Sequence, residues 1–255
     1  MIKRLRYTPL NLTHSPLILS LVIVAIGFAA GIVPFFFRWT HLTAHRWIAF
    51  GAGTILGVTF LHMLPEGYEL AGAWGIPFLL AGFLTLYVIE QFAFRHPHDE
   101  EKGDFHELGF LSFLGFTVHD VIDGIALGSG GHVPELTPAI FLALVLHKIP
   151  TTFAFSLLML HGGYGRKSIV KYLCILLAAI PAGVLLSGWV VNIIGEQERT
   201  IGALINFSAG TFLYIGAYEL LPEMHRHSEK GSRIGIYFVS GLALMGLLKL
   251  LHPVI

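Results

Sequence analysis

Residues 52–66 read AGTILGVTFLHMLPE, and residues 209–223 read AGTFLYIGAYELLPE. The two stretches are 157 positions apart, and seven of their fifteen positions are identical, including the closing Leu-Pro-Glu. Both stretches are apolar over most of their length. Such likeness between two apolar segments, with a shared Pro-Glu, indicates an internal repeat rather than a chance similarity.

The composition around this repeat is that of a membrane protein. The chain has 255 residues, of which 55% are hydrophobic and 13% charged, and its mean hydropathy is +0.72. Soluble domains carry about 25% charged residues, so a soluble enzyme or a disordered tail is excluded. Sixteen basic and sixteen acidic residues cancel, which excludes a nucleic-acid binder. The single cysteine, Cys174, excludes intramolecular disulfides and cysteine-based metal sites.

Apolar runs divide the whole chain into membrane spans. A helix needs about 20 apolar residues to cross a bilayer. The sequence predicts an all-α integral membrane protein with a single eight-span domain over residues 1–255, with spans at 15–37, 46–66, 74–94, 108–129, 136–161, 168–195, 200–224 and 233–252. The repeat copies fall in spans two and seven, which run in opposite directions. Inverted repeats of this kind are typical of alternating-access transporters.

The distribution of Lys and Arg predicts the orientation. Loops that follow odd-numbered spans hold ten of these residues, and the opposite side holds five. Because basic loops face the cytoplasm, we expect both termini outside. Compact loops and the absence of a targeting extension favour a bacterial plasma (inner) membrane.

Spans four and five contain the densest set of polar residues. Span four includes FTVHDVIDGIALG, with His119, Asp120 and Asp123 on one helix face. Span five includes LALVLHKIPTTFAF, where His147, Lys148 and Thr151 repeat those positions 28 residues later. Both histidines fall near the middle of the membrane, so two antiparallel helices can direct these sets at each other.

This chemistry favours a metal path. Imidazole nitrogen and carboxylate oxygen suit zinc, manganese or ferrous iron, and His119, Asp123 and His147 give three ligands at one level. Pro150 lacks an N–H, which frees the Leu146 carbonyl for a cation or water. Gly124 and Gly128 would let a neighbouring helix approach closely. The alternative is a buried polar network in which Lys148 pairs with Asp120.

The repeat adds further candidates for a transport path. His62 and Glu219 occupy equivalent positions, as do Glu66 and Glu223. His62 and Glu66 lie toward the outer end of span two, and Glu219 and Glu223 toward the inner end of span seven. We expect entry and exit ligands at these positions, although Glu66 and Glu223 are equally consistent with helix ends that face water.

These features together resemble the ZIP (Zrt/Irt-like) family of divalent-metal transporters over nearly the whole chain. The resemblance rests on eight spans, the histidine-led motifs of spans four and five, and two Leu-Pro-Glu helix ends. It implies transport of zinc, iron, manganese or cadmium into the cytosol, a homodimer, and an elevator motion of spans one, four, five and six against the others. It transfers the metal site to six residues: His119, Asp120, Asp123, His147, Lys148 and Thr151.

The resemblance implies a site for two metal ions, and this sequence departs from the family pattern where the second ion would bind. Span four usually reads His-Asn-x-x-Glu, and span five usually has glutamates where this chain has Lys148 and Thr151. The adjacent His147 and Lys148 resemble the His-Lys pair that one branch of the family has in span five. Two aspartates and one lysine leave a net charge of −1, which suits one divalent ion better than two. We therefore predict a mononuclear site in which Lys148 replaces the second cation.

Two other functions remain open from the sequence. A membrane-embedded zinc hydrolase would use the same histidines and aspartates with the metal as cofactor, but no HExxH motif is present and the inverted repeat has no role in it. A non-transporting metal sensor would fit the altered span-five motif. For the transporter, binding requires neutral imidazole and ionised carboxylate, so protons should exchange for metal at low pH.

Overall fold

The structure is a computed structural model that describes residues 15–93, 103–130, 137–194, 197–222 and 233–251, and this part of the chain is helical, without strands. The long helices are α1 (Pro16–Ile32), α2 (His41–Val58), α3 (Leu64–Ala71), α4 (Ile76–Ala93), α5 (Gly103–Gly130), α6 (Thr137–His161), α7 (Arg166–Ile194), α8 (Gln197–Leu213) and α10 (Ile234–Leu251). Short 3₁₀ turns, η2 (Val33–Phe36) and η4 (Gly72–Gly75), and π-turns, η3 (Thr59–Met63) and η5 (Tyr214–Leu220), connect or extend them.

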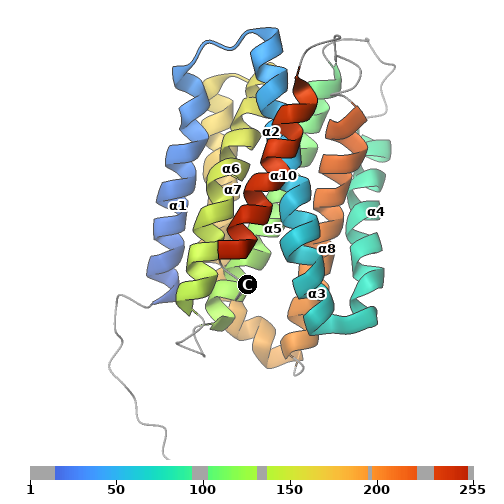
Figure 1. Cartoon of the computed structure of the whole chain (residues 1–255). Helices are drawn as coiled ribbons and strands as arrows, with labels where there is room; N and C mark the ends of the chain where they lie inside the picture. The colour runs from blue at the N-terminus through green and yellow to red at the C-terminus, as the bar shows by residue number, and fades with distance from the viewer. Residues whose placement is uncertain (1–14, 94–102, 131–136, 195–196, 223–232, 252–255) are drawn as a thin grey trace, which may run out of the picture.

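Helices occupy the apolar ranges that the sequence predicts. Among the described residues, six helical stretches are long and apolar enough to cross a membrane. One of them, Leu42–Phe92, contains α2, α3 and α4, and a shorter apolar helix follows at Ile234–Leu250. The described chain begins and ends at the same end of the bundle, the lower end in Figure 1. The number of crossings stays a prediction.

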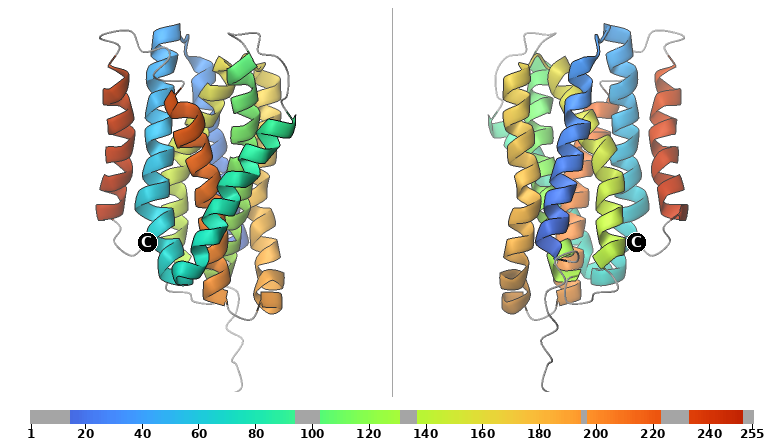
Figure 2. Two further views of the ribbon diagram at one scale, coloured as in Figure 1. Left: turned by 90° about the vertical axis from the view of Figure 1, so that its right-hand side faces the viewer. Right: turned by 90° about the vertical axis from the view of Figure 1, so that its left-hand side faces the viewer.

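The helices form two groups that pack side by side. In the first, which we call the site bundle, α5 packs along α7, and α1 lies against α6 and α7. In the second, the flanking bundle, α10 packs along α2, and α8 lies against α3 and α4. The two bundles meet mainly where α6 contacts α2 and α5 contacts α8, as the paired views of Figure 2 let the reader follow.

Glycines set the closest helix approaches within each bundle. A Cβ added to Gly124 of α5 would lie 2.0 Å from the Ile180 carbonyl oxygen of α7, and one added to Gly53 of α2 would lie 2.1 Å from the Phe238 oxygen of α10. A Cβ on Gly128 would likewise lie 2.3 Å from the Ser187 hydroxyl. The predicted close approach at Gly124 and Gly128 is thus confirmed, with α7 as the neighbour.

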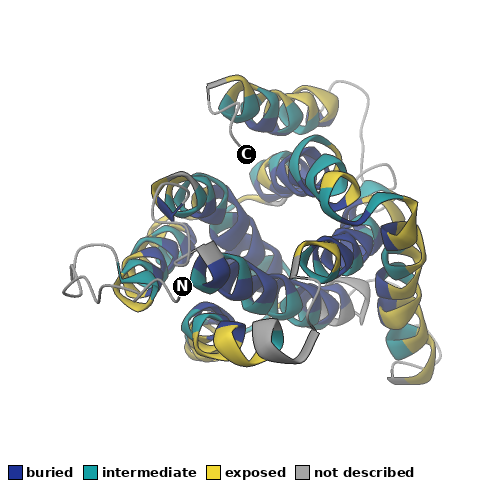
Figure 3. Ribbon diagram, turned by 90° about the horizontal axis from the view of Figure 1, so that it is seen from below, coloured by how far each residue is buried: buried dark blue, intermediate teal, exposed yellow. Residues whose placement is uncertain are grey.

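The outer surface is apolar, as a lipid environment requires. Exposed residues gather on the outward faces of the helices in Figure 3, whereas buried residues face inward. Many of the exposed side chains are large and hydrophobic, among them Phe36, Phe92, Leu185, Trp189 and Leu250. Soluble proteins rarely expose apolar areas this large, so these faces contact lipid.

The two repeat copies share an unusual backbone feature. The π-turn η3 ends at Met63, two residues before Pro65, and the π-turn η5 ends at Leu220, two residues before Pro222. Met63 and Leu220 are 157 positions apart, which is the offset of the sequence repeat. The helices that contain them run in opposite directions in Figure 1. The structure therefore supports an inverted repeat through its backbone as well as its sequence.

Candidate metal site between α5 and α6

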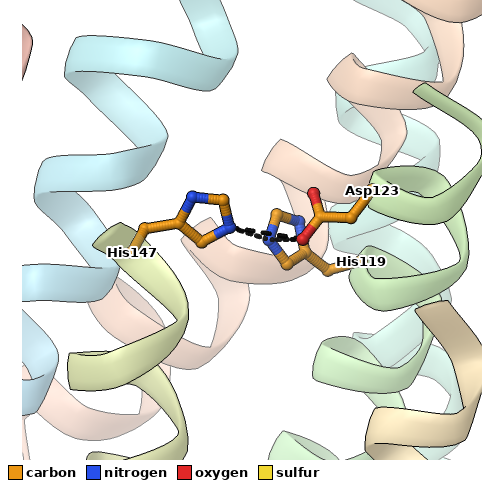
Figure 4. Close-up of side chains that lie close together, drawn as sticks. All are labelled: His119, Asp123 and His147. Carbon is orange, nitrogen blue, oxygen red and sulfur yellow. Dashed lines mark hydrogen bonds and ion pairs between the residues drawn. The ribbon is translucent and has the colours of Figure 1, made fainter. Parts of the chain in front are cut away.

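Three side chains from two helices converge at the centre of the molecule. His119 and Asp123 lie one turn apart on α5, and His147 reaches them from α6 (Figure 4). Asp123 Oδ2 lies 3.2 Å from His119 Nε2 and 3.2 Å from His147 Nε2. The two Nε2 atoms are 3.4 Å apart. His119 and Asp123 are buried, and His147 is partly exposed.

This spacing fits a divalent metal ion. Zinc binds nitrogen and carboxylate oxygen at about 2.0–2.2 Å in tetrahedral geometry, which separates its ligand atoms by about 3.3 Å. The three atoms of this site lie 3.2–3.4 Å from one another, so an ion can bind all three with little movement of the helices. The group is also the one cluster of three or more potential ligands that the described residues form.

Lys148 of α6 binds both aspartates of α5. Its Nζ lies 2.5 Å from Asp120 Oδ1 and 3.1 Å from Asp123 Oδ2, and Lys148 and Asp120 are each 1% exposed. Burial of a charge is costly without a partner, so this ion pair fixes the side-chain positions. Asp123 thus contacts both the histidines and the lysine, whereas Asp120 faces the lysine and lies outside the three-ligand cluster. Its role as a metal ligand stays a prediction.

A residue of the flanking bundle completes the surroundings of His119. Ser208 of α8 is fully buried, and its Oγ lies 3.0 Å from His119 Nδ1. A hydrogen bond at Nδ1 fixes the imidazole so that Nε2 is presented to a metal. Phe212 packs on the same imidazole, with ring centroids 4.4 Å apart. Sequence reasoning missed both residues. The sequence pattern that could have drawn attention to Ser208 is its position directly before the second repeat copy.

The Thr151 side chain hydrogen-bonds to the backbone of α6 and is not part of the cluster. Its hydroxyl donates to the carbonyls of His147 and Lys148, at 2.9 and 3.1 Å. Helix α6 continues through Pro150, and Leu146 lines the cavity beside the site. The hydroxyl bonds therefore stabilise the turn that carries both His147 and Lys148. A place for Thr151 on the transport path stays a prediction.

A cavity of about 120 Å³ lies beside the cluster. Its lining includes His119, Asp123 and His147, together with His62 of η3 and Glu66 of α3. The other lining residues of α5 and α6, such as Ala126 and Ile140, lie in the halves of those helices nearer the two described chain ends. The structure thus places two of the predicted path residues beside the site.

Aromatic residues fill the space on the other side of His119. Phe116 packs against Phe155 and Phe212, with ring centroids 5.9 and 5.1 Å apart. Glu219 lies in η5, beyond these rings, and is not among the cavity residues. Glu223 lies outside the described residues. The structure therefore brings His62 and Glu66 to the site and does not bring Glu219 there.

Comparisons with known proteins identify a family for this chain. Residues 95–249 match the family model described as ZIP Zinc transporter. Zinc transporter ZIP9 of Micropogonias undulatus is 29% identical over 170 residues, which cover 62% of this chain and 55% of the relative. Zinc transporter 3 of Arabidopsis thaliana is 29% identical over 245 residues, or 80% of this chain and 72% of the relative.

A third relative, zinc transporter ZIP1 of Danio rerio, is 24% identical over 284 residues, with 86% of this chain and 91% of the relative covered. The chain spans only 51% to 60% of the length of the ZIP9 proteins of Micropogonias and Xenopus that it matches. The family model nevertheless covers well over half of the chain and includes both helices of the cluster. The chain, an all-helical integral membrane protein, belongs to the ZIP zinc transporter family.

Proposed function

We propose that this protein transports a divalent transition metal, with zinc as the first candidate, through a single site formed by His119, Asp123 and His147. The observation that carries this proposal is the cluster itself, whose three ligand atoms lie 3.2–3.4 Å apart at the inner end of a cavity. Because its relatives include zinc transporters, we take zinc as the first candidate for the transported ion. Manganese, ferrous iron and cadmium offer related coordination chemistry.

The ion pairs of Lys148 support one metal rather than two. Its ammonium group contacts Asp120 and Asp123 at the position where a second cation would need the same carboxylates. With neutral histidines, the two aspartates and Lys148 leave a charge of −1, and one divalent ion brings the site to +1. A second ion would raise this to +3 in a buried environment, at a large electrostatic cost.

Transport is favoured over hydrolysis and sensing by the arrangement of the two bundles. The cavity lies on one side of the cluster, and packed aromatic rings occupy the other side. A site that faces one end at a time is what alternating access requires. We infer an elevator motion in which the site bundle moves relative to the flanking bundle, so that the cluster opens to the other end.

The direction of transport follows from the proposed orientation. With the termini outside, as the Lys and Arg distribution indicates, the observed cavity faces outward, and His62 and Glu66 are entry ligands. Glu219 and Glu223 are then exit ligands, and metal moves into the cytosol. We further propose a homodimer in a plasma membrane, the bacterial inner membrane being the one that the compact loops favour.

Uptake into proteoliposomes tests the proposal. Wild-type protein should accumulate zinc, and His119→Ala should abolish uptake because it removes a ligand. Thr117→Ala is the matched control, since Thr117 lies on the same helix and its hydroxyl donates to the Phe113 carbonyl of that helix. Uptake of none of the four metals by a folded wild-type protein that still binds zinc would reject transport in favour of a sensor or a hydrolase.

Titration calorimetry tests the number of ions. Wild-type protein should bind one zinc ion per chain at this site. Lys148→Glu removes the ammonium and adds a carboxylate, so it should bind two. A wild-type stoichiometry of two at the cluster would contradict the mononuclear proposal.

A further inference from the structure

The π-turn η3 contains a backbone carbonyl that its own helix does not satisfy in the usual way. In an α-helix, the Leu61 carbonyl would accept from the N–H of residue 65, but that residue is proline and has none. Lys249 of α10 supplies the donor, with its Nζ 2.5 Å from the Leu61 oxygen. A side chain from a helix distant in sequence thus replaces the missing backbone bond.

The position of this bond relates it to the metal path. Leu61 directly precedes His62, which lines the cavity, and Glu66 follows on the next turn. Met245 and Leu248, on the same helix as Lys249, also line the cavity. The charge of Lys249 interacts electrostatically with both His62 and Glu66. The bond therefore lies at the cavity wall, on the segment that carries the proposed entry ligand.

We propose that Lys249 is a positioning residue that holds the π-turn η3 and thereby directs His62 into the metal cavity. This inference rests on the proposed function in giving His62 a role in metal entry. Lys249 itself is not a ligand: its ammonium group is cationic and donates to the Leu61 carbonyl.

The physical reason lies in the geometry of the turn. A π-turn has one more residue than an α-helical turn of the same rise, so it changes which side chains share a face. Pro65 cannot supply the α-helical donor for the Leu61 carbonyl, and the Lys249 ammonium group donates to it. A hydrogen bond to a charged group is stronger than one between neutral groups, so loss of the ammonium favours other conformations of the turn. In those conformations, His62 no longer faces the cavity.

Cysteine accessibility measures this orientation without requiring transport. The chain has a single cysteine, Cys174, which is exposed on α7 and is first replaced by serine. His62→Cys in that background should react with a membrane-impermeant thiol reagent from the cavity side. Lys249→Met should slow the reaction about tenfold, as expected from the loss of one charged hydrogen bond. Lys249→Arg keeps the donor and should preserve the rate.

Lys171→Met is the matched control, since Lys171 is an exposed lysine of α7 that does not line the cavity. It should leave the rate unchanged. If Lys249→Met does not yield folded protein, Lys249→Gln, which shortens the donor and removes its charge, takes its place with the same expected slowing. An unchanged rate in the folded variant, or a rate that Lys249→Arg fails to preserve, would overturn the proposal.

Zinc uptake gives the second readout. Lys249→Met should raise KM about tenfold with kcat unchanged, because it affects entry and leaves the cluster intact. Combined with His62→Ala, it should add nothing further, whereas additive effects would show that Lys249 acts independently of His62 and would overturn the proposal. If wild-type protein transports no metal, the proposed function fails, but the labelling rates still decide whether Lys249 positions residue 62.

Discussion

The two bundles differ in the kind of polar group that they bury. Among the described residues, the buried Asp and Lys side chains, Asp120, Asp123 and Lys148, all belong to the site bundle. The buried polar side chains of the flanking bundle carry no fixed charge: His45, Thr54, Thr59, Asn206, Ser208 and Thr211. Groups that need one another electrostatically thus lie in one bundle, so a motion between the bundles does not separate a buried ion pair.

The contacts within and between bundles differ as well. Inside each bundle, some glycines bring backbone against backbone, as at Gly124 with Ile180 and Gly53 with Phe238, whereas others, such as Gly57, meet side chains. Between the bundles, glycines meet side chains instead: a Cβ on Gly51 would meet the Cβ of Ala154 first. The glycine contacts that bring two backbones together thus lie within the bundles, which is consistent with the motion between bundles proposed above.

Removal of Lys148 should have the largest effect on stability. Lys148→Met leaves two buried aspartates without their cation, and breaking a buried ion pair costs about 3–5 kcal/mol. Thermal unfolding in detergent should show a large loss. Adding Asp120→Asn removes one of the orphaned charges and should recover part of it. Equal stability of Lys148→Met and wild type would mean that the ion pairs do not hold the site bundle together.

A side chain added at the close contact between α5 and α7 should have the next largest effect on stability. Gly124→Ala places a Cβ against the Ile180 carbonyl and should destabilise the protein by about 1–3 kcal/mol. Gly188→Ala, on α7, is the matched control, because a Cβ there meets nothing within 4 Å. Thermal unfolding of both variants checks the comparison, and similar melting temperatures would show that the close approach is not required.

The smallest predicted effect belongs to the hydrogen bond between His119 of the cluster and Ser208 of the flanking bundle. Ser208→Ala removes the partner of His119 Nδ1 and should weaken zinc affinity about tenfold, the lower range for such supporting contacts. Stability should change little. Calorimetry checks the affinity, and an unchanged value would mean that Phe212 and the helix alone orient the imidazole.

Much of this molecule was predictable because local patterns determine it. Apolar runs of about 20 residues predict where the helices lie, and the i, i+4 spacing of His119 and Asp123 places both on one face. The motif positions 28 residues apart predicted that His147 and Lys148 would meet α5. These inferences need only helix geometry and antiparallel packing.

The remainder depends on contacts between segments distant in sequence. Nothing local shows that Ser208 would reach His119, or that Lys249 would reach the carbonyl that Pro65 leaves without a donor. Asp120 and Asp123 share a helix face by periodicity and both contact Lys148, yet only Asp123 joins the histidines. The contacts that these side chains make depend on how the neighbouring helices pack.

An anomalous difference map at the zinc edge, from crystals of the zinc-loaded protein, tests the central claim most directly. We predict one peak per chain between α5 and α6, within about 2.2 Å of His119 Nε2, Asp123 Oδ2 and His147 Nε2. Two peaks between these helices, or a single peak bound by Asp120 without the histidines, would contradict the mononuclear site on which the proposed transport depends.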